Sequence, residues 1–132
     1  DYNDGTTPVV RAVFANTPEG YAVCGGDIPV GATLSVGTID MNEIIATATG
    51  ALKSALASKP DCILIFSCVG RYFYMGYEPM REIEEAKGIL DPLGLPYQIT
   101  YSGGEFCPVY SGNKEGQTIN RNHNDTIVIC TL

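Results

Sequence analysis

Basic residues, histidine and long apolar runs are all scarce in this chain of 132 residues. Eight residues are Lys or Arg against 15 Asp or Glu, so the formal net charge is −7 at pH 7. The basic residues are scattered, whereas a nucleic-acid surface gathers them on one face, and we therefore expect no nucleic-acid partner. Because no apolar run approaches the roughly 20 residues that span a bilayer, we also expect no membrane insertion.

Recognisable metal and cofactor motifs are missing as well. The chain has one histidine, and no two of its five cysteines have the two-residue separation of a zinc knuckle or a redox pair. Its glycines match neither G-x-x-x-x-G-K nor G-x-G-x-x-G, the two phosphate-binding fingerprints. We therefore predict no metal, no cofactor and reduced thiols, as is typical of a cytoplasmic protein.

The most apolar run of the chain spans residues 62–71 and reads Cys-Ile-Leu-Ile-Phe-Ser-Cys-Val-Gly-Arg. Its lack of polar alternation and its β-branched residues predict a strand buried on both faces. Ser67, Cys68 and Arg71 would then lie at the carboxyl end of this strand. Ligand sites in α/β sheets form at such ends, so the run points to a binding site there.

Helical spacing of apolar residues appears between Asp40 and Pro60, with Asp40 as a plausible N-cap and Glu43 three residues later. A second helix is expected from about Glu78 to Asp91, with Pro79 in its first turn. The Asn- and Gly-rich residues 111–125 predict a long loop. Strands are expected at residues 8–14, 21–24, 33–39, 62–69, 97–101, 106–110 and 126–132.

This order of elements predicts an α+β or α/β fold in a single domain. We expect a mixed, mostly antiparallel sheet of about six to seven strands, with two main helices packed against it. The last strand is a candidate neighbour of strand 62–69 because both are strongly apolar. Residues 1–7 read as a leader or linker and residues 8–132 as the domain. A start at Asp1 rather than Met suggests a fragment of a larger protein.

Three short polar motifs fall where strands meet loops, at residues 66–71, 102–106 and 120–126. If they converge, Arg71 can recognise a carboxylate and Glu105 an ammonium group, which would suit a small zwitterion such as an amino acid. The alternative is that Arg71 and Glu105 pair with each other and close a loop. Asn124 and Thr126 also have a structural alternative, because such side chains often bond neighbouring backbone groups.

A nucleophilic site is a further alternative, with Cys68 as nucleophile, His123 as base and Glu105 as the group that orients the base. No helix is expected directly after Cys68 to lower the pKa of its thiol. His123 lies in an Asn-rich stretch and is expected to be exposed. We therefore predict that the protein is not an enzyme, with a Cys68-dependent amidase or transferase as the minor alternative.

Taken together, the motifs resemble the C-terminal domain of the FIST family, named for F-box and intracellular signal transduction proteins. The resemblance rests on Pro29-Val30-Gly31 before a strand, the strand that ends in Ser67-Cys68-Val69-Gly70-Arg71, the Gly104-Glu105 pair, and Asn124-Asp125-Thr126 before the last strand. This chain differs from the usual pattern at Gly103 and Phe106, so a ligand's identity does not carry over. The candidate ligand-binding residues are Cys68, Gly70, Arg71, Gly104, Glu105, Asn124 and Thr126.

The resemblance implies a cytoplasmic, non-enzymatic sensory domain of a signal transduction protein that binds small ligands, with amino acids as candidates. It also implies an N-terminal FIST domain in the same chain as a partner. The alternative function is a protein–protein interaction module of a signalling or F-box-type adaptor. That alternative predicts exposed aromatic residues, with 72–77 as the candidate patch, and no enclosed cavity.

Overall fold

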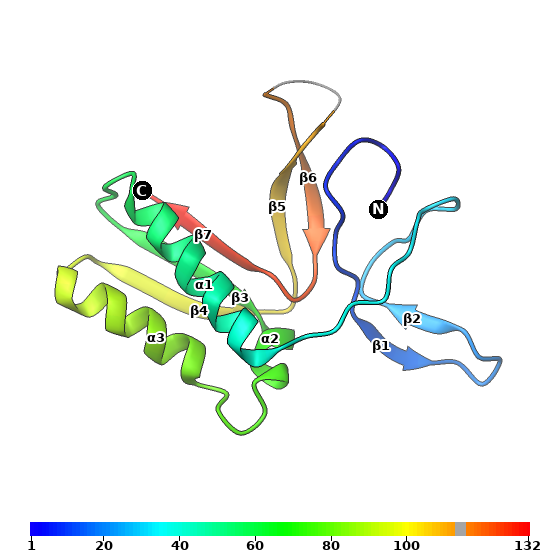
Figure 1. The fold of residues 1–132 in the computed structure, drawn as a ribbon, viewed down its shortest axis with the longest axis horizontal. Coiled ribbons are helices and arrows are strands. Elements are labelled where there is room, and N and C mark those ends of the chain that lie inside the picture. Colours follow the sequence, from blue (N-terminus) through cyan, green and yellow to red (C-terminus); the bar gives the residue numbers. More distant parts are fainter. Residues whose placement is uncertain (113–115) are drawn as a thin grey trace.

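The computed structural model describes residues 1–112 and 116–132 (Figure 1). The α+β fold is confirmed, with two main helices and seven strands among these residues. In chain order the elements are β1 (Val13–Asn16), β2 (Ala22–Cys24), α1 (Met41–Leu56), β3 (Ile63–Cys68), α2 (Val69–Tyr74), α3 (Arg81–Leu90), the 3-10 turn η1 (Asp91–Leu93), β4 (Tyr97–Ser102), β5 (Glu105–Tyr110), β6 (Thr118–His123) and β7 (Ile127–Thr131).

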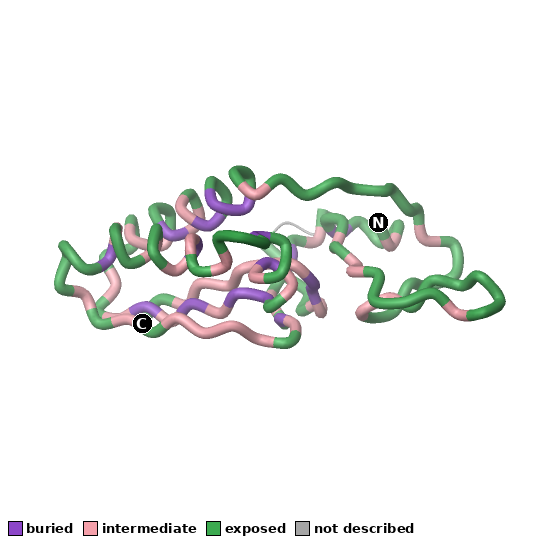
Figure 2. Tube along the Cα trace, turned by 90° about the horizontal axis from the view of Figure 1, so that it is seen from below, coloured by how far each residue is buried: buried purple, intermediate pink, exposed green. Residues whose placement is uncertain are grey.

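A three-stranded sheet of order β4-β3-β7 is the centre of the fold. β3 runs parallel to β4, with Cys68 opposite Ser102, and antiparallel to β7. The expected pairing of the last strand with the apolar strand is therefore confirmed. Helices α1 and α3 cover one face of this sheet, and Figure 2 shows them as a layer on one side of the strands.

The core lies between that sheet face and the two helices. Asp40 begins α1 as predicted, because its carboxylate accepts hydrogen bonds from the backbone N–H groups of Asn42 (2.8 Å) and Glu43 (3.2 Å). Leu52 of α1, Leu90 of α3 and two residues of β3 then pack together and are almost completely buried. The core cluster is Leu52, Ile63, Ile65 and Leu90.

The strands are divided among three sheets rather than joined in one. β1 and β2 form a hairpin, and so do β5 and β6. The break between β4 and β5 falls at Gly103-Gly104, where Gly104 has a φ of 148°, a conformation that L side chains rarely adopt. The chain leaves the central sheet there, and Figure 1 shows the β5–β6 hairpin projecting away from it.

Two of the expected strands differ in the structure. Residues 33–39 form no strand, and in the described part of the chain residues 34–39 make no backbone–backbone hydrogen bond. Alternating apolar residues favour an extended backbone, but a strand also needs a neighbour to pair with. The strand expected at 8–14 begins only at Val13, and β1 continues to Asn16.

Two further expectations are wrong. Residues 111–125 are not one long loop, because β6 occupies Thr118–His123 and pairs with β5; residues 113–115 lie outside the described part. A helix does begin directly after Cys68, since α2 spans Val69–Tyr74 and Cys68 is its N-cap residue. The apolar pattern did not reveal α2 because this helix is short and buries only Arg71.

Residues 1–39 form an arm that lies beside the central sheet and helices, and Figure 2 shows it largely exposed. Within the stretch expected as a leader, Thr6 is buried and bridges to Ser111. Arg11 donates a hydrogen bond to the carbonyl of Asn122 at 2.8 Å, which fixes the arm to β6. Across residues 1–112 and 116–132, no helix has both the length and the apolar character that crossing a membrane requires.

Candidate functional site

Glu105 is the centre of a polar cluster at the carboxyl ends of the parallel strands β3 and β4. Its side chain is buried, with the residue only 4% exposed. The hydroxyl of Ser102, at the end of β4, donates to its Oε1 at 2.5 Å, and the hydroxyl of Thr126 donates to its Oε2 at 3.1 Å. Two segments distant in the sequence therefore meet at this carboxylate, as the sequence predicted for residues 102–106 and 120–126.

Cys68, Gly70 and Asp125 form the adjoining part of the cluster. The backbone N–H of Cys68 donates to the carbonyl of Thr126 at 2.9 Å, which joins the end of β3 to the start of β7. A Cβ atom on Gly70 would lie 2.0 Å from Oδ1 of Asp125. Gly70 is therefore needed for close packing of the Asp125 carboxylate against α2. Asp125 itself has a φ of 56°, the left-handed conformation that Asp tolerates better than most residues.

Burial and neighbouring carboxylates set the protonation of this cluster. Burial raises the pKa of the Cys68 thiol, and the charges of Glu105 and Asp125 act in the same direction, while backbone hydrogen bonds from Gly70 and Asp125 oppose them. Burial also raises the pKa of Asp125, and the charge of Glu105 adds to that effect. The cluster is thus acidic, and its thiol is held in the protonated form at neutral pH.

Arg71 lies on the other side of β3, among the helices. Its Nε and Nη2 donate to Oε1 of Glu82 at 2.9 and 2.5 Å, and Nη2 also donates to the carbonyl of Ile44 at 2.9 Å. The hydroxyl of Ser67 donates to Oε2 of Glu82 at 2.6 Å. Arg71 therefore pairs with Glu82, so neither its placement beside Glu105 in a ligand site nor the alternative pairing of Arg71 with Glu105 is found. Glu82 lies 11 residues further along the chain, in α3, where no local pattern pointed to it.

Asn124 and Gly104 have positions separate from the Glu105 carboxylate. Oδ1 of Asn124 accepts a hydrogen bond from the backbone N–H of Ala12 at 3.1 Å, and its Nδ2 donates to the carbonyl of His123 at 3.2 Å. Asn124 thus has the structural role that the sequence offered as its alternative. Gly104 forms the corner between β4 and β5. Of the seven candidates, the structure brings together Cys68, Gly70, Glu105 and Thr126.

His123 also belongs to this site, and the prediction that it is exposed is wrong. It is only 7% exposed, and it stands directly opposite Glu105 in the β5–β6 ladder. Its Nε2 is buried and has no hydrogen-bond partner among the described residues. Burial lowers the pKa of the imidazole, while a hydrogen bond with the backbone of Cys107 raises it. Recognising β6 as a strand would have placed His123 beside Glu105.

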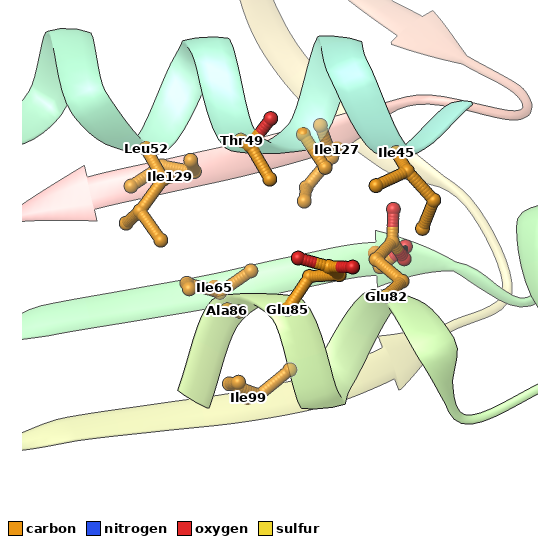
Figure 3. Close-up of a pocket in the computed structure, with 12 residues that line it drawn as sticks. Ile45, Thr49, Leu52, Ile65, Glu82, Glu85, Ala86, Ile99, Ile127 and Ile129 are labelled. Carbon is orange, nitrogen blue, oxygen red and sulfur yellow. Dashed lines mark hydrogen bonds between the residues drawn. The ribbon is translucent and has the colours of Figure 1, made fainter. Parts of the chain in front are cut away.

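Two hollows among the described residues lie elsewhere. A narrow cavity of about 10 Å³ lies between the sheet and helices α1 and α3. Figure 3 shows the apolar side chains that line it, with Glu82 at one end. That volume has room for about one water molecule. A surface hollow of about 550 Å³ is lined by residues 77–81 and by Glu84 and Glu85. Neither includes Glu105, Asp125 or His123.

Comparison with known proteins gives one match. The sequence profile described as the FIST C domain matches residues 2–108 of the 132, so it includes Cys68, Arg71 and Glu105 and ends before Asn124 and Thr126. No curated protein and no solved structure matches the chain. Because the profile match covers well over half of the sequence, the chain belongs to the FIST C domain family.

Proposed function

We propose that this chain is a non-enzymatic sensory domain of a cytoplasmic signalling protein that binds a small molecule at the cluster around Glu105. This edge cluster consists of Cys68, Ser102, Glu105, His123, Asp125 and Thr126. Family membership associates the chain with signal transduction. The observation that carries the proposal is the buried Glu105 carboxylate, which two hydroxyls orient and for which no ion pair exists among the described residues.

The state of Cys68 supports a role in binding rather than in catalysis. A cysteine nucleophile reacts as the thiolate, whereas burial and two nearby carboxylates raise the pKa of this thiol. In the part of the chain that the structure describes, no hydrogen bond joins Cys68 to His123. A base acting on the thiol would need to be within hydrogen-bond reach, directly or through one water.

A second domain is part of this proposal. The edge cluster is not enclosed by either of the two cavities described above. Small-molecule sites usually bury most of the ligand surface. We propose that an N-terminal FIST domain in the same protein covers the cluster and encloses the ligand.

A thermal-shift screen of amino acids, small amines and small carboxylates tests the proposal. We expect at least one compound to raise the melting temperature in a saturable manner, because a ligand that binds only the folded state stabilises it. Glu105→Gln should abolish that shift. The matched control is Glu43→Gln, which neutralises an exposed carboxylate in α1. An unchanged shift in Glu105→Gln would place the ligand outside the edge cluster.

The aromatic residues after β3 favour a second candidate function, a protein–protein interaction module of a signalling or F-box-type adaptor. Phe73 is 72% exposed, Tyr74 48% and Tyr77 105%. Aromatic side chains are enriched at protein interfaces, and exposed groups of them mark interaction sites. The small volume of the cavity between the helices also agrees with this alternative.

Proximity labelling with matched variants tests this second function. We expect proteins enriched by the wild-type chain to be lost with the double variant Phe73→Ser/Tyr77→Ser. Tyr21→Ser is the control, because it removes an aromatic residue that is 69% exposed in the arm. Equal enrichment by all three chains would exclude the 73–77 surface as the docking site.

A further inference from the structure

Glu105, Asp125 and His123 supply hydrogen-bond acceptors to the edge cluster, and the protonated thiol of Cys68 is a weak donor. Glu105 receives one hydroxyl hydrogen on each oxygen, and a carboxylate oxygen can accept more than one hydrogen bond. The carboxylate of Asp125 lies beside it on the α2 side and feels its charge. The two carboxylates repel each other, and the charge of Arg71 partly opposes the resulting rise in the pKa of Asp125.

His123 adds a third acceptor to the same place. Glu105 and His123 are directly opposed on neighbouring strands, which brings their Cβ atoms to about 4.5–5.5 Å and both side chains to one face of the hairpin. A hydrogen bond with the backbone of Cys107 acts on the ring, and since Nε2 has no partner, we assign that bond to Nδ1. With this assignment, Nε2 of the neutral ring has a buried lone pair without a partner.

Three arginines lie near members of this cluster, and each is engaged mainly by other groups. The guanidinium of Arg71 is held by Glu82 on the helix side of β3. Arg121 pairs with Asp4, although its Nε is buried without a partner among the described residues, and Arg11 donates to the carbonyls of Asp27 (3.2 Å) and Asn122 (2.8 Å). A ligand carboxylate placed next to Glu105 and Asp125 would meet two like charges, and the Arg71 guanidinium, whose charge acts on Asp125, is already paired with Glu82.

From these contacts we propose that the edge cluster selects small primary amines, whose ammonium N–H groups donate to Glu105, Asp125 and Nε2 of His123, over amino acids and carboxylates. This inference rests on the proposed ligand-binding function and names its ligand class. An ammonium group has three donors and no acceptor, which suits the acceptors that β5, β6 and the turn before β7 supply.

Nuclear magnetic resonance titration of the full chain tests the proposal, because His123 is the only histidine and its ring signals need no further assignment. The probes are ethylammonium, tetramethylammonium, glycine and acetate, at constant ionic strength and neutral pH. We expect a saturable shift of the His123 ring nitrogen signals with ethylammonium. Tetramethylammonium has the same charge but no N–H donor, so it should produce no saturable shift.

Variants test which carboxylate accepts hydrogen bonds from the ligand. Glu105→Gln keeps the size of the side chain but removes its charge, and we expect ethylammonium to bind at least about tenfold more weakly, as for the loss of one charge-assisted hydrogen bond. Asp125→Asn is the second variant, because Asp125 is only partly buried and its replacement disturbs the fold less. Glu43→Gln is the control and should bind as the wild-type chain does.

The outcomes distinguish the two proposals. Saturable binding of glycine or acetate, but not of ethylammonium, would overturn the amine class and leave the small-ligand function standing. Equal shifts with ethylammonium and tetramethylammonium would also overturn it, because donation by the ligand would then be irrelevant. If neither these probes nor any compound of the thermal-shift screen binds, the ligand-binding function fails as well.

Discussion

At the scale of single residues, Arg71 connects three separate parts of the molecule, which indicates a structural role. It contacts Glu82 of α3, the carbonyl of Ile44 in α1 and, at 3.5 Å, the carbonyl of Asp125 before β7. Arg71 is 5% exposed and Glu82 4%. Removing one partner of such a pair leaves the other charge buried and uncompensated.

We therefore expect Arg71→Ala to lower the free energy of unfolding by about 3–5 kcal/mol, measured by urea denaturation. Arg81→Ala is the control, because Arg81 at the start of α3 pairs with the exposed Glu78 before the helix, and its loss should change stability by at most about 1 kcal/mol. A small change in the free energy of unfolding of Arg71→Ala, together with loss of ligand binding, would show that Arg71 belongs to the binding site.

His123 makes stability depend on pH. Burial lowers the pKa of its imidazole below the ordinary 6.5, and the charge of Arg11 acts in the same direction, while the Cys107 backbone and Glu105 oppose them. The unfolded chain therefore binds a proton at a higher pH than the folded chain does. The contribution of His123 to the free energy of unfolding is fully present above about pH 6.5 and is lost as the pH falls below that value.

The expected result is a decrease in the free energy of unfolding between about pH 7 and about pH 5.5, measured by urea denaturation at several pH values. His123→Asn keeps a donor near the position of Nδ1 but does not titrate, so its profile should be flatter in this window. Asp125 has a raised pKa and acts in the opposite sense, because the folded state gains stability when this carboxyl is protonated at lower pH. Identical profiles for the two proteins would remove His123 as the cause.

At the scale of elements, helix α1 was the most completely predictable part. Its cap, its apolar spacing and its stop at Pro60 are all local signals, and the structure places the helix at Met41–Leu56. We expect Asp40→Ala to lower the free energy of unfolding by about 1 kcal/mol, because two backbone N–H groups lose their acceptor. Asp40→Asn keeps an oxygen acceptor and should be nearly neutral in thermal denaturation; equal losses in both variants would contradict the capping role.

Elements that depend on a neighbour were harder to predict. Residues 33–39 have a strand-like pattern but no partner, whereas Thr118–His123 is polar and becomes β6 because β5 lies alongside it. The same limitation affected the site. The convergence of Glu105 and Thr126 followed from strand ends and was predicted, but the partner of Arg71 and the burial of His123 depend on tertiary packing.

At the scale of the whole molecule, apolar burial is unevenly distributed. The core cluster and the residues packed against it lie between Leu52 and Ile129. In the arm of residues 1–39, Thr6 is the one buried residue, and Val30 and Val36 are fully exposed. The free energy of folding therefore comes mainly from residues after the arm, since it scales with the apolar area removed from water.

Deletion of residues 1–39 tests this division. We expect residues 40–132 to keep the helices and the central sheet, with a cooperative urea transition and an unchanged far-ultraviolet helix signal. Stability should decrease, because Asn124 loses the Ala12 N–H and β6 loses the Arg11 contact. The slope of the unfolding free energy against urea concentration reports the surface exposed on unfolding. The fractional decrease in this slope should therefore be clearly smaller than the fraction of residues removed, which is 39 of 132. A proportional fall, or loss of the cooperative transition, would show that the arm is part of the folding core.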